Sequence, residues 1–163
     1  MRNSSRPRRA AAIGGIVIAA ATAIVAAQPA TAEEKPVIEF LNSGKVVPAS
    51  LPFSEAVRVG DTLYLSGQIG IKPGTLQLVP GGIKEEARQT LENIKTSLEA
   101  NGYTMRDIVK CTVMLADIFE WAAFNDVYKT AFTPPYPARS AMGTGGLAMG
   151  ARVEVECIAA KAK

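Results

Sequence analysis

The chain has 163 residues and a formal net charge of +3, with no histidine. Its first 32 residues hold four arginines and no acidic residue, so residues 33–163 have 14 basic and 15 acidic side chains and a net charge of −1. Those 131 residues suffice for one domain with a sizeable core, and they lack the basic footprint that indicates a nucleic-acid partner. Without histidine, and with two cysteines that form no clustered ligand pattern, neither a metal site nor another cofactor is predicted.

Residues 1–32 resemble a bacterial secretory signal peptide. A positive head of four arginines precedes the uncharged, alanine-rich stretch from Ala10 to Ala27, and Ala30-Thr31-Ala32 provides the small residues that a signal peptidase needs. An uncleaved membrane anchor is the alternative, because the apolar stretch is close to the ~18 residues that can span a bilayer. Since alanine is weakly apolar, we expect cleavage and export to the periplasm or secretion, with membrane contact only if the leader is retained.

The first half of the remaining chain predicts strands followed by a helix. Val37–Phe40 is typical of an edge strand, and the β-prone segments 56–59 and 62–67 flank the turn Gly60-Asp61, which indicates a hairpin. A helix is predicted between Gly81-Gly82 and Asn101-Gly102. Apolar residues recur there along one helical face, namely Ala87, Leu91, Ile94 and Leu98.

The second half adds a strand, a helix and two strands. Residues 107–115 alternate with strand period, and residues 117–132 predict a second helix that ends before Pro134-Pro135. Residues 139–144 and 151–160 predict two strands joined by a turn. This order predicts an α+β fold, with a single layer of mixed sheet and two helices packed on one face.

The last predicted strand has two different faces. Alternation points one set of side chains toward the helices, namely Val153, Val155, Cys157 and Ala159. It points Glu154, Glu156 and Ile158 to the opposite face. A face that mixes apolar and charged groups is often buried against another subunit, which favours an oligomer.

Cys111 and Cys157 lie among apolar neighbours in strand-like segments. We expect two buried thiols that behave as small hydrophobic side chains. A cross-strand disulfide is the alternative, since an exported protein meets oxidising conditions, and it requires Cα atoms about 5.5 Å apart.

Arg139 and Glu154 are the best candidates for a small-molecule site. Arg139 follows a proline-rich loop, and its planar guanidinium is suited to binding a carboxylate through two hydrogen bonds. Glu154 lies on the next predicted strand and is a candidate for orienting a water molecule. A surface ion pair is the alternative role for Arg139, and an interface salt bridge is the alternative for Glu154.

Five segments, in this order, resemble successive blocks of the RidA (YjgF/YER057c/UK114) family. They are Pro52–Val57, Gly60–Ile69, Asn125–Tyr128, Pro137–Ser140 and Val153–Glu156. The resemblance runs from about Phe53 to Ala160 and makes residues 33–163 a RidA-like domain. It implies a chorismate-mutase-like fold and a homotrimer whose sheets form an inner barrel, with sites in the clefts between subunits.

The resemblance also implies an activity, that of a 2-iminobutanoate/2-iminopropanoate deaminase. Such an enzyme is a hydrolase acting on C–N bonds that converts small 2-imino or 2-enamino acids to 2-keto acids and ammonia. By the same resemblance, Arg139 holds the substrate carboxylate, Glu154 places the water, and the backbone carbonyl of Gly67 contributes. The alternatives are a non-catalytic binding module for carboxylate-bearing metabolites and a chaperone-like protective protein.

Four further positions match substrate-binding positions of the family: Phe53, Ser66, Asn125 and Ala141. The family often has tyrosine at Phe53 and cysteine at Ala141, and both departures favour larger or more apolar substrate side chains. For Asn125 the alternative is a structural hydrogen bond, and for Ser66 and Gly67 it is a tight strand end.

Overall fold

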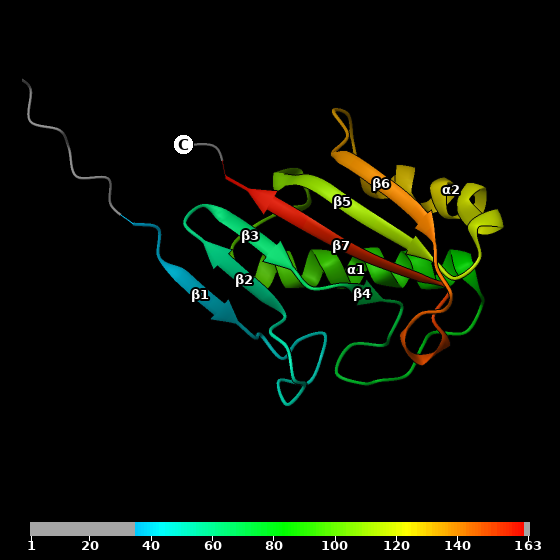
Figure 1. Cartoon of the computed structure of the whole chain (residues 1–163), viewed down its shortest axis with the longest axis horizontal. Coiled ribbons are helices and arrows are strands. Elements are labelled where there is room, and N and C mark those ends of the chain that lie inside the picture. Colours follow the sequence, from blue (N-terminus) through cyan, green and yellow to red (C-terminus); the bar gives the residue numbers. More distant parts are fainter. Residues whose placement is uncertain (1–34, 162–163) are drawn as a thin grey trace, which may run out of the picture. The chain divides into compact units, whose positions relative to one another are not determined.

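A mixed sheet carries both long helices on one face (Figure 1). The computed structural model describes residues 35–161, so the predicted signal peptide lies outside the described residues. Along the sheet the strands run in the order β1-β2-β3-β7-β5-β6, and β4 also pairs with β7. The predicted α+β fold is therefore confirmed. Within the described part of the chain, no helix is both long and apolar enough to cross a membrane.

The elements follow the predicted order. The strands are β1 (Ile38–Leu41), β2 (Ala56–Val59), β3 (Thr62–Leu65), β4 (Gln68–Ile69), β5 (Ile108–Leu115), β6 (Ala138–Gly143) and β7 (Val153–Ala160). The helices are α1 (Ile83–Ala100) and α2 (Trp121–Ala131), and short 3-10 turns cover Met105–Asp107, Ile118–Glu120 and Ala148–Gly150.

Several boundaries differ from the sequence prediction, and two of these differences have a clear local cause. Helix α2 begins at Trp121 and not at residue 117, because the Asp117 side chain accepts a hydrogen bond from the Phe119 N–H and caps a separate 3-10 turn. Strand β7 begins at Val153 and not at residue 151, since a 3-10 turn precedes it in the segment predicted as a simple turn.

The core lies between the sheet and the helices. The apolar face of α1 is buried as its spacing predicts, and so are the alternate residues of β5 and β7 that point toward it. The buried residues of the central pair are Ile108, Cys111, Val113 and Leu115 on β5 and Val153, Val155, Cys157 and Ala159 on β7. The other residues of β7, which include Glu154 and Glu156, point to the helix-free face.

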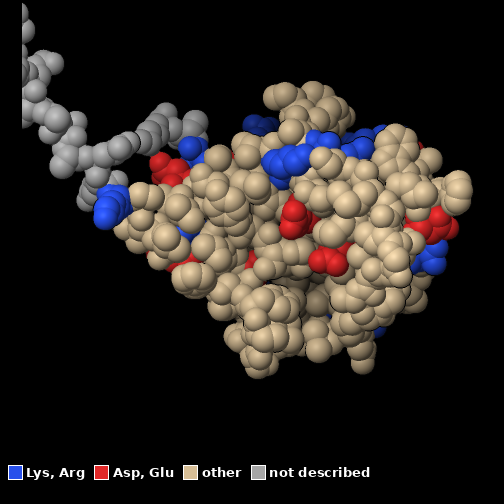
Figure 2. Space-filling model, in the orientation of Figure 1, with Lys and Arg blue, Asp and Glu red and all other residues tan. Residues whose placement is uncertain are grey.

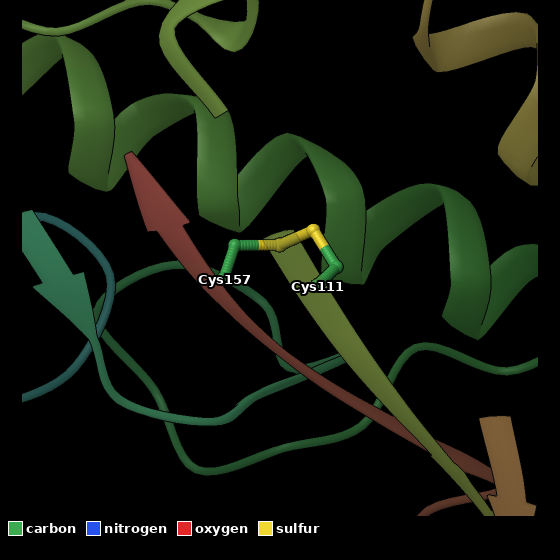
Figure 3. The surroundings of a disulfide bond; sticks show 2 residues. All are labelled: Cys111 and Cys157. Atoms are coloured by element: carbon green, nitrogen blue, oxygen red, sulfur yellow. A yellow bond between two sulfur atoms is a disulfide. The ribbon is translucent and has the colours of Figure 1, made fainter. Parts of the chain in front are cut away.

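Cys111 and Cys157 form a disulfide beneath α1 (Figure 3). The expectation of two buried thiols is therefore wrong. Strands β5 and β7 pair antiparallel in a register that places the two cysteines directly opposite each other, with Cα atoms 4.1 Å apart. Both residues point to the helix side of the sheet and are essentially inaccessible to solvent. The bond thus links the two central strands covalently within the core.

Candidate active site

Arg139 on β6 is held against aromatic rings of α2. Its guanidinium carbon lies 4.5 Å from the ring centre of Tyr128, 5.9 Å from that of Phe124 and 6.0 Å from that of Trp121. Rings at these distances attract a cation through their negative faces. Among residues 35–161, Arg139 has neither a hydrogen bond nor an ion pair from its side chain, so its N–H donors remain free for a ligand. The alternative of a surface ion pair is not observed there.

A cavity of about 440 Å³ adjoins Arg139. It is lined by Asn125, Tyr128, Lys129, Tyr136, Pro137 and Arg139. Arg139 and Asn125, both predicted site residues, therefore share one cavity. Tyr128 and Tyr136 also line this cavity, although neither was predicted from the sequence as a site residue.

The Tyr128 hydroxyl is buried and has no hydrogen-bond partner within the described residues. Tyr128 is 5% exposed, and its burial raises the pKa of the phenol, an effect that the nearby Arg139 charge partly opposes. A buried, unpaired hydroxyl is uncommon in a native structure, since it gives up its hydrogen bonds to water. This hydroxyl is therefore a further candidate ligand contact beside Arg139.

A second cavity, of about 280 Å³, brings together Phe53, Gly67 and Glu154. The resemblance placed these three residues in one site, and here they line one cavity. Glu154 makes no hydrogen bond or ion pair with another residue in the range 35–161. Burial, and to a smaller extent the charge of Glu156, raises the pKa of Glu154 above its usual value. A half-buried carboxylate with a raised pKa and no partner is suited to exchanging protons with a ligand.

Gly67 allows the Glu154 carboxylate to occupy its position. A Cβ atom placed on Gly67 would lie 2.0 Å from Glu154 Oε1, a separation that side chains cannot adopt. The two residues approach because β4, which follows Gly67, pairs with β7 and sets Ile69 opposite Glu154. Glycine at position 67 is therefore required by the close approach of this carboxylate.

A buried carboxylate anchors the loop that carries Phe53. Glu55 is fully buried and accepts hydrogen bonds from the Ser43 N–H (2.7 Å), the Ser43 hydroxyl (2.6 Å) and the Ser97 hydroxyl of α1. The Ser66 hydroxyl donates to the carbonyl oxygen of Ser54. These bonds fix the segment around Phe53 against α1 and the end of β3, and they give Ser66 a structural role.

Two predicted site residues line neither cavity. Ser66 uses its hydroxyl within the loop network, and the exposed Ala141 lies opposite Val113 at the edge of the sheet. Neither residue is among those that surround Arg139 or Glu154.

Arg139 and Glu154 do not meet within one chain. Strand β5 separates β6 from β7, and its register aligns Arg139 with Cys111 but Glu154 with Met114. Arg139 lies against α2 on the helix side, whereas Glu154 points to the helix-free face. Figure 2 views that face and shows acidic groups set singly among mostly uncharged side chains. A single chain therefore presents two candidate half-sites, one with Arg139 and Asn125, the other with Phe53, Gly67 and Glu154.

The fold and its half-sites define a small α+β protein in which candidate ligand-binding groups occupy both sides of a mixed sheet. Residues 44–161 match the sequence model of the family described as Endoribonuclease L-PSP. The chain belongs to this family, which is the RidA (YjgF/YER057c/UK114) family. The predicted resemblance is thus confirmed.

Individual relatives agree in sequence and in fold. A goat (Capra hircus) protein named 2-iminobutanoate/2-iminopropanoate deaminase is 48% identical over 120 residues, which cover 74% of this chain and 88% of the relative. The crystal structure of RidA from a Psychrobacter species is 39% identical, with a TM-score of 0.71, and covers 76% of this chain and 99% of that one. Escherichia coli TdcF with bound serine is 31% identical at the same TM-score and the same coverage.

Proposed function

We propose that the protein is a 2-iminobutanoate/2-iminopropanoate deaminase-type enzyme, which hydrolyses 2-imino or 2-enamino acids to 2-keto acids and ammonia. The observation that carries this proposal is Arg139, a cation held on aromatic rings with its hydrogen-bond donors unused. Relatives named for this activity, at up to 48% identity, support it. The family description also names an endoribonuclease, but the goat relative and its mammalian counterparts are named for imine deamination.

The proposed reaction needs no strong nucleophile, because the imine carbon is already electrophilic. Arg139 binds the substrate carboxylate through two hydrogen bonds and fixes the imine carbon in place. Glu154 accepts a proton from a water molecule as its oxygen bonds to the imine carbon, and returns the proton to the nitrogen. The hydroxyl of the resulting carbinolamine then gives its proton, through Glu154, to the amino nitrogen as the C–N bond breaks, which gives the keto acid and ammonia. The Gly67 carbonyl accepts a hydrogen bond from the reacting N–H or from water. A pKa raised toward neutrality suits Glu154 to both proton transfers.

We further propose that each active site is completed by two copies of the chain in a homotrimer. The separation of Arg139 and Glu154 onto different faces of the sheet supports a shared site, because a closed ring of copies brings unlike faces together. The number three rests on the family resemblance. Measuring the mass of the assembly in solution tests the homotrimer, and a monomer would overturn it.

We propose that the leader, residues 1–32, directs export, so that the enzyme meets imino acids in the periplasm or outside the cell. Cell fractionation followed by mass spectrometry tests this proposal. A periplasmic or secreted protein that begins at Glu33 is expected. A chain that keeps the leader in the membrane fraction would support the anchor instead.

The activity is tested with 2-iminopropanoate generated in place by an amino-acid oxidase acting on alanine. Semicarbazide competes for the imine, so an active deaminase lowers semicarbazone formation and raises free pyruvate and ammonia. Arg139→Ala should lower kcat/KM by about 100- to 1,000-fold, taking roughly 1.5–2 kcal/mol for each of two charge-assisted hydrogen bonds.

A matched control is Arg88→Ala, which removes an exposed arginine that pairs with Glu85 on α1 and lines neither cavity. It should retain the parent activity. Binding of keto acids without turnover would favour the binding module, and protection of other proteins without either property would favour the chaperone-like role. Equal rates for the parent and Arg139→Ala would remove Arg139 from the site.

A further inference from the structure

Helix α1, which packs against β4 and β7, buries polar side chains as well as apolar ones (Figure 1). Four polar residues, each at most 6% exposed, recur along it at spacings of four, three and four: Glu86, Thr90, Asn93 and Ser97. At 3.6 residues per turn these spacings place them in one line beside the apolar face, and together they form the polar stripe of α1. A buried polar side chain is costly unless it makes hydrogen bonds, so the stripe needs partners in the segments that it covers.

Asn93, in the middle of the stripe, holds β4 and the residues that follow it. Its amide nitrogen donates hydrogen bonds to the carbonyl oxygens of Ile69 (3.0 Å) and Ile71 (2.9 Å), and its amide oxygen accepts one from the Gln89 amide (2.9 Å). Asn93 itself is inaccessible to solvent. Because Ile69 lies opposite Glu154 in the pairing of β4 with β7, the two donated bonds fix the backbone directly beside the candidate carboxylate.

The two ends of the stripe hold other parts of the same half-site. Glu86 accepts a hydrogen bond from the backbone N–H of Arg152 (2.8 Å), the residue that precedes β7. The Ser97 hydroxyl donates to the buried carboxylate of Glu55, in the segment that carries Phe53. The stripe therefore bonds to three segments that are far apart in the sequence, and each leads into residues that line the cavity of about 280 Å³.

Thr90 differs from the other members of the stripe. It is fully buried, but its hydroxyl has no hydrogen-bond partner among residues 35–161. Thr90 lies one turn from both Glu86 and Asn93, so it shares their position on the helix without bonding to the cavity segments. Removing its hydroxyl changes the polarity of the stripe without removing a bond.

We propose that Glu86, Asn93 and Ser97 are positioning residues of the deaminase, and that Asn93 has the largest effect because it makes two bonds to the segment beside Glu154. The inference rests on the proposed function and specifies how one helix aligns the half-site that places the water. None of the three residues is among those that line the cavity, so they act through the backbone of β4, the start of β7 and the segment around Phe53. Small displacements of a catalytic group are enough to lower the rate strongly.

Two variants of the stripe form a matched pair. Asn93→Leu keeps a similar size and removes both N–H donors, whereas Thr90→Val removes only the unpaired hydroxyl. Asn93→Leu should lower kcat for 2-iminopropanoate by about 10- to 100-fold and change KM by less than about three-fold, because Arg139, which binds the carboxylate, belongs to the other half-site. Thr90→Val should retain the parent kcat. Thermal melting confirms that each variant is folded at the assay temperature.

The pKa of Glu154 provides a measurement that a smaller folded fraction does not move. Burial is the main cause of its raised pKa and the charge of Glu156 is the smaller one, while its neighbours across β4 and β5, Ile69 and Met114, are uncharged. Loosening the segment beside Glu154 admits water to the carboxylate, so Asn93→Leu should lower this pKa toward its ordinary value. Carbon NMR titration of the side-chain carboxyl measures it without substrate, and the signal is assigned by its loss in Glu154→Gln.

The two measurements separate the two proposals. A parent protein that deaminates no imine, with a lowered Glu154 pKa in Asn93→Leu, overturns the enzyme but supports the positioning role. Parent values of kcat and pKa in folded Asn93→Leu overturn the positioning role alone, and so do equal losses in Asn93→Leu and Thr90→Val. If Asn93→Leu does not fold, Ser97→Ala removes a single hydroxyl and takes its place. Its kcat and its Glu154 pKa should both be lower than those of the parent, and parent values for both would overturn the proposal.

Discussion

If two copies share each active site, two inactive variants should restore activity to each other. Arg139→Ala inactivates the half-site next to α2, and Glu154→Gln inactivates the half-site on the helix-free face. In a mixed trimer, each site draws its arginine from one copy and its glutamate from a neighbouring copy. Whether the trimer holds two copies of one variant or of the other, one of its three sites receives both intact residues, so about one third of the parent activity should return.

Co-expression of the two variants with different affinity tags, followed by two successive purifications, isolates the mixed assemblies. Imine deamination is then measured per site against each variant alone, which should retain a few per cent of the parent rate or less. The control pairs Arg139→Ala with the double variant Arg139→Ala/Glu154→Gln, which supplies no intact arginine and should stay inactive. Recovery no greater than in this control would refute the shared site, because a site within one chain cannot be repaired by a neighbour.

Three further predictions follow from the geometry. Gly67→Ala should lower kcat/KM by about 10- to 100-fold with little change in melting temperature, because the Cβ of the alanine displaces the Glu154 carboxylate. An unchanged kcat/KM would contradict the requirement for glycine at position 67. Reduction of the Cys111–Cys157 bond, which closes a loop of 46 residues, should lower the free energy of unfolding by about 4 kcal/mol, measured by urea denaturation with and without reductant. Since Glu154 must be ionised to accept the proton from water, the rate should fall as the pH drops through its raised pKa. Glu156→Gln removes the negative charge that helps to raise the pKa of Glu154, so it should lower that pKa and extend activity to lower pH. An unchanged fall in rate on the acid side of the pH profile would contradict the effect of Glu156 on Glu154.

The local pattern of the sequence was enough to predict most of the fold. Apolar spacing identified α1, and strict alternation identified β5 and the two faces of β7, because each depends on the period of its own element. The disulfide was not predicted, since it depends on which residue of β5 lies opposite Cys157. Periodicity within one strand carries no information about its register with another strand.

The candidate site was predicted only in part, again because a local sequence pattern does not show how separate elements are placed in the fold. Motif matching identified Arg139, Glu154 and Gly67 as chemically suitable residues, but it did not show that the first two lie on different faces. The unpaired Tyr128 hydroxyl was missed because its helical spacing is that of an ordinary core residue.

The surroundings of Arg139 explain how the arginine stays available for a substrate. A carboxylate partner in the same chain would compete with the carboxylate of a ligand for the same donors. Aromatic rings hold the cation without using those donors. The fold also keeps other acidic groups occupied or distant, since Glu120 pairs with Arg152 and Glu154 lies across the sheet. Placing Glu154 on the other face therefore prevents an ion pair with Arg139 in the same chain, and in the proposed assembly a bound carboxylate separates the two charges where copies meet.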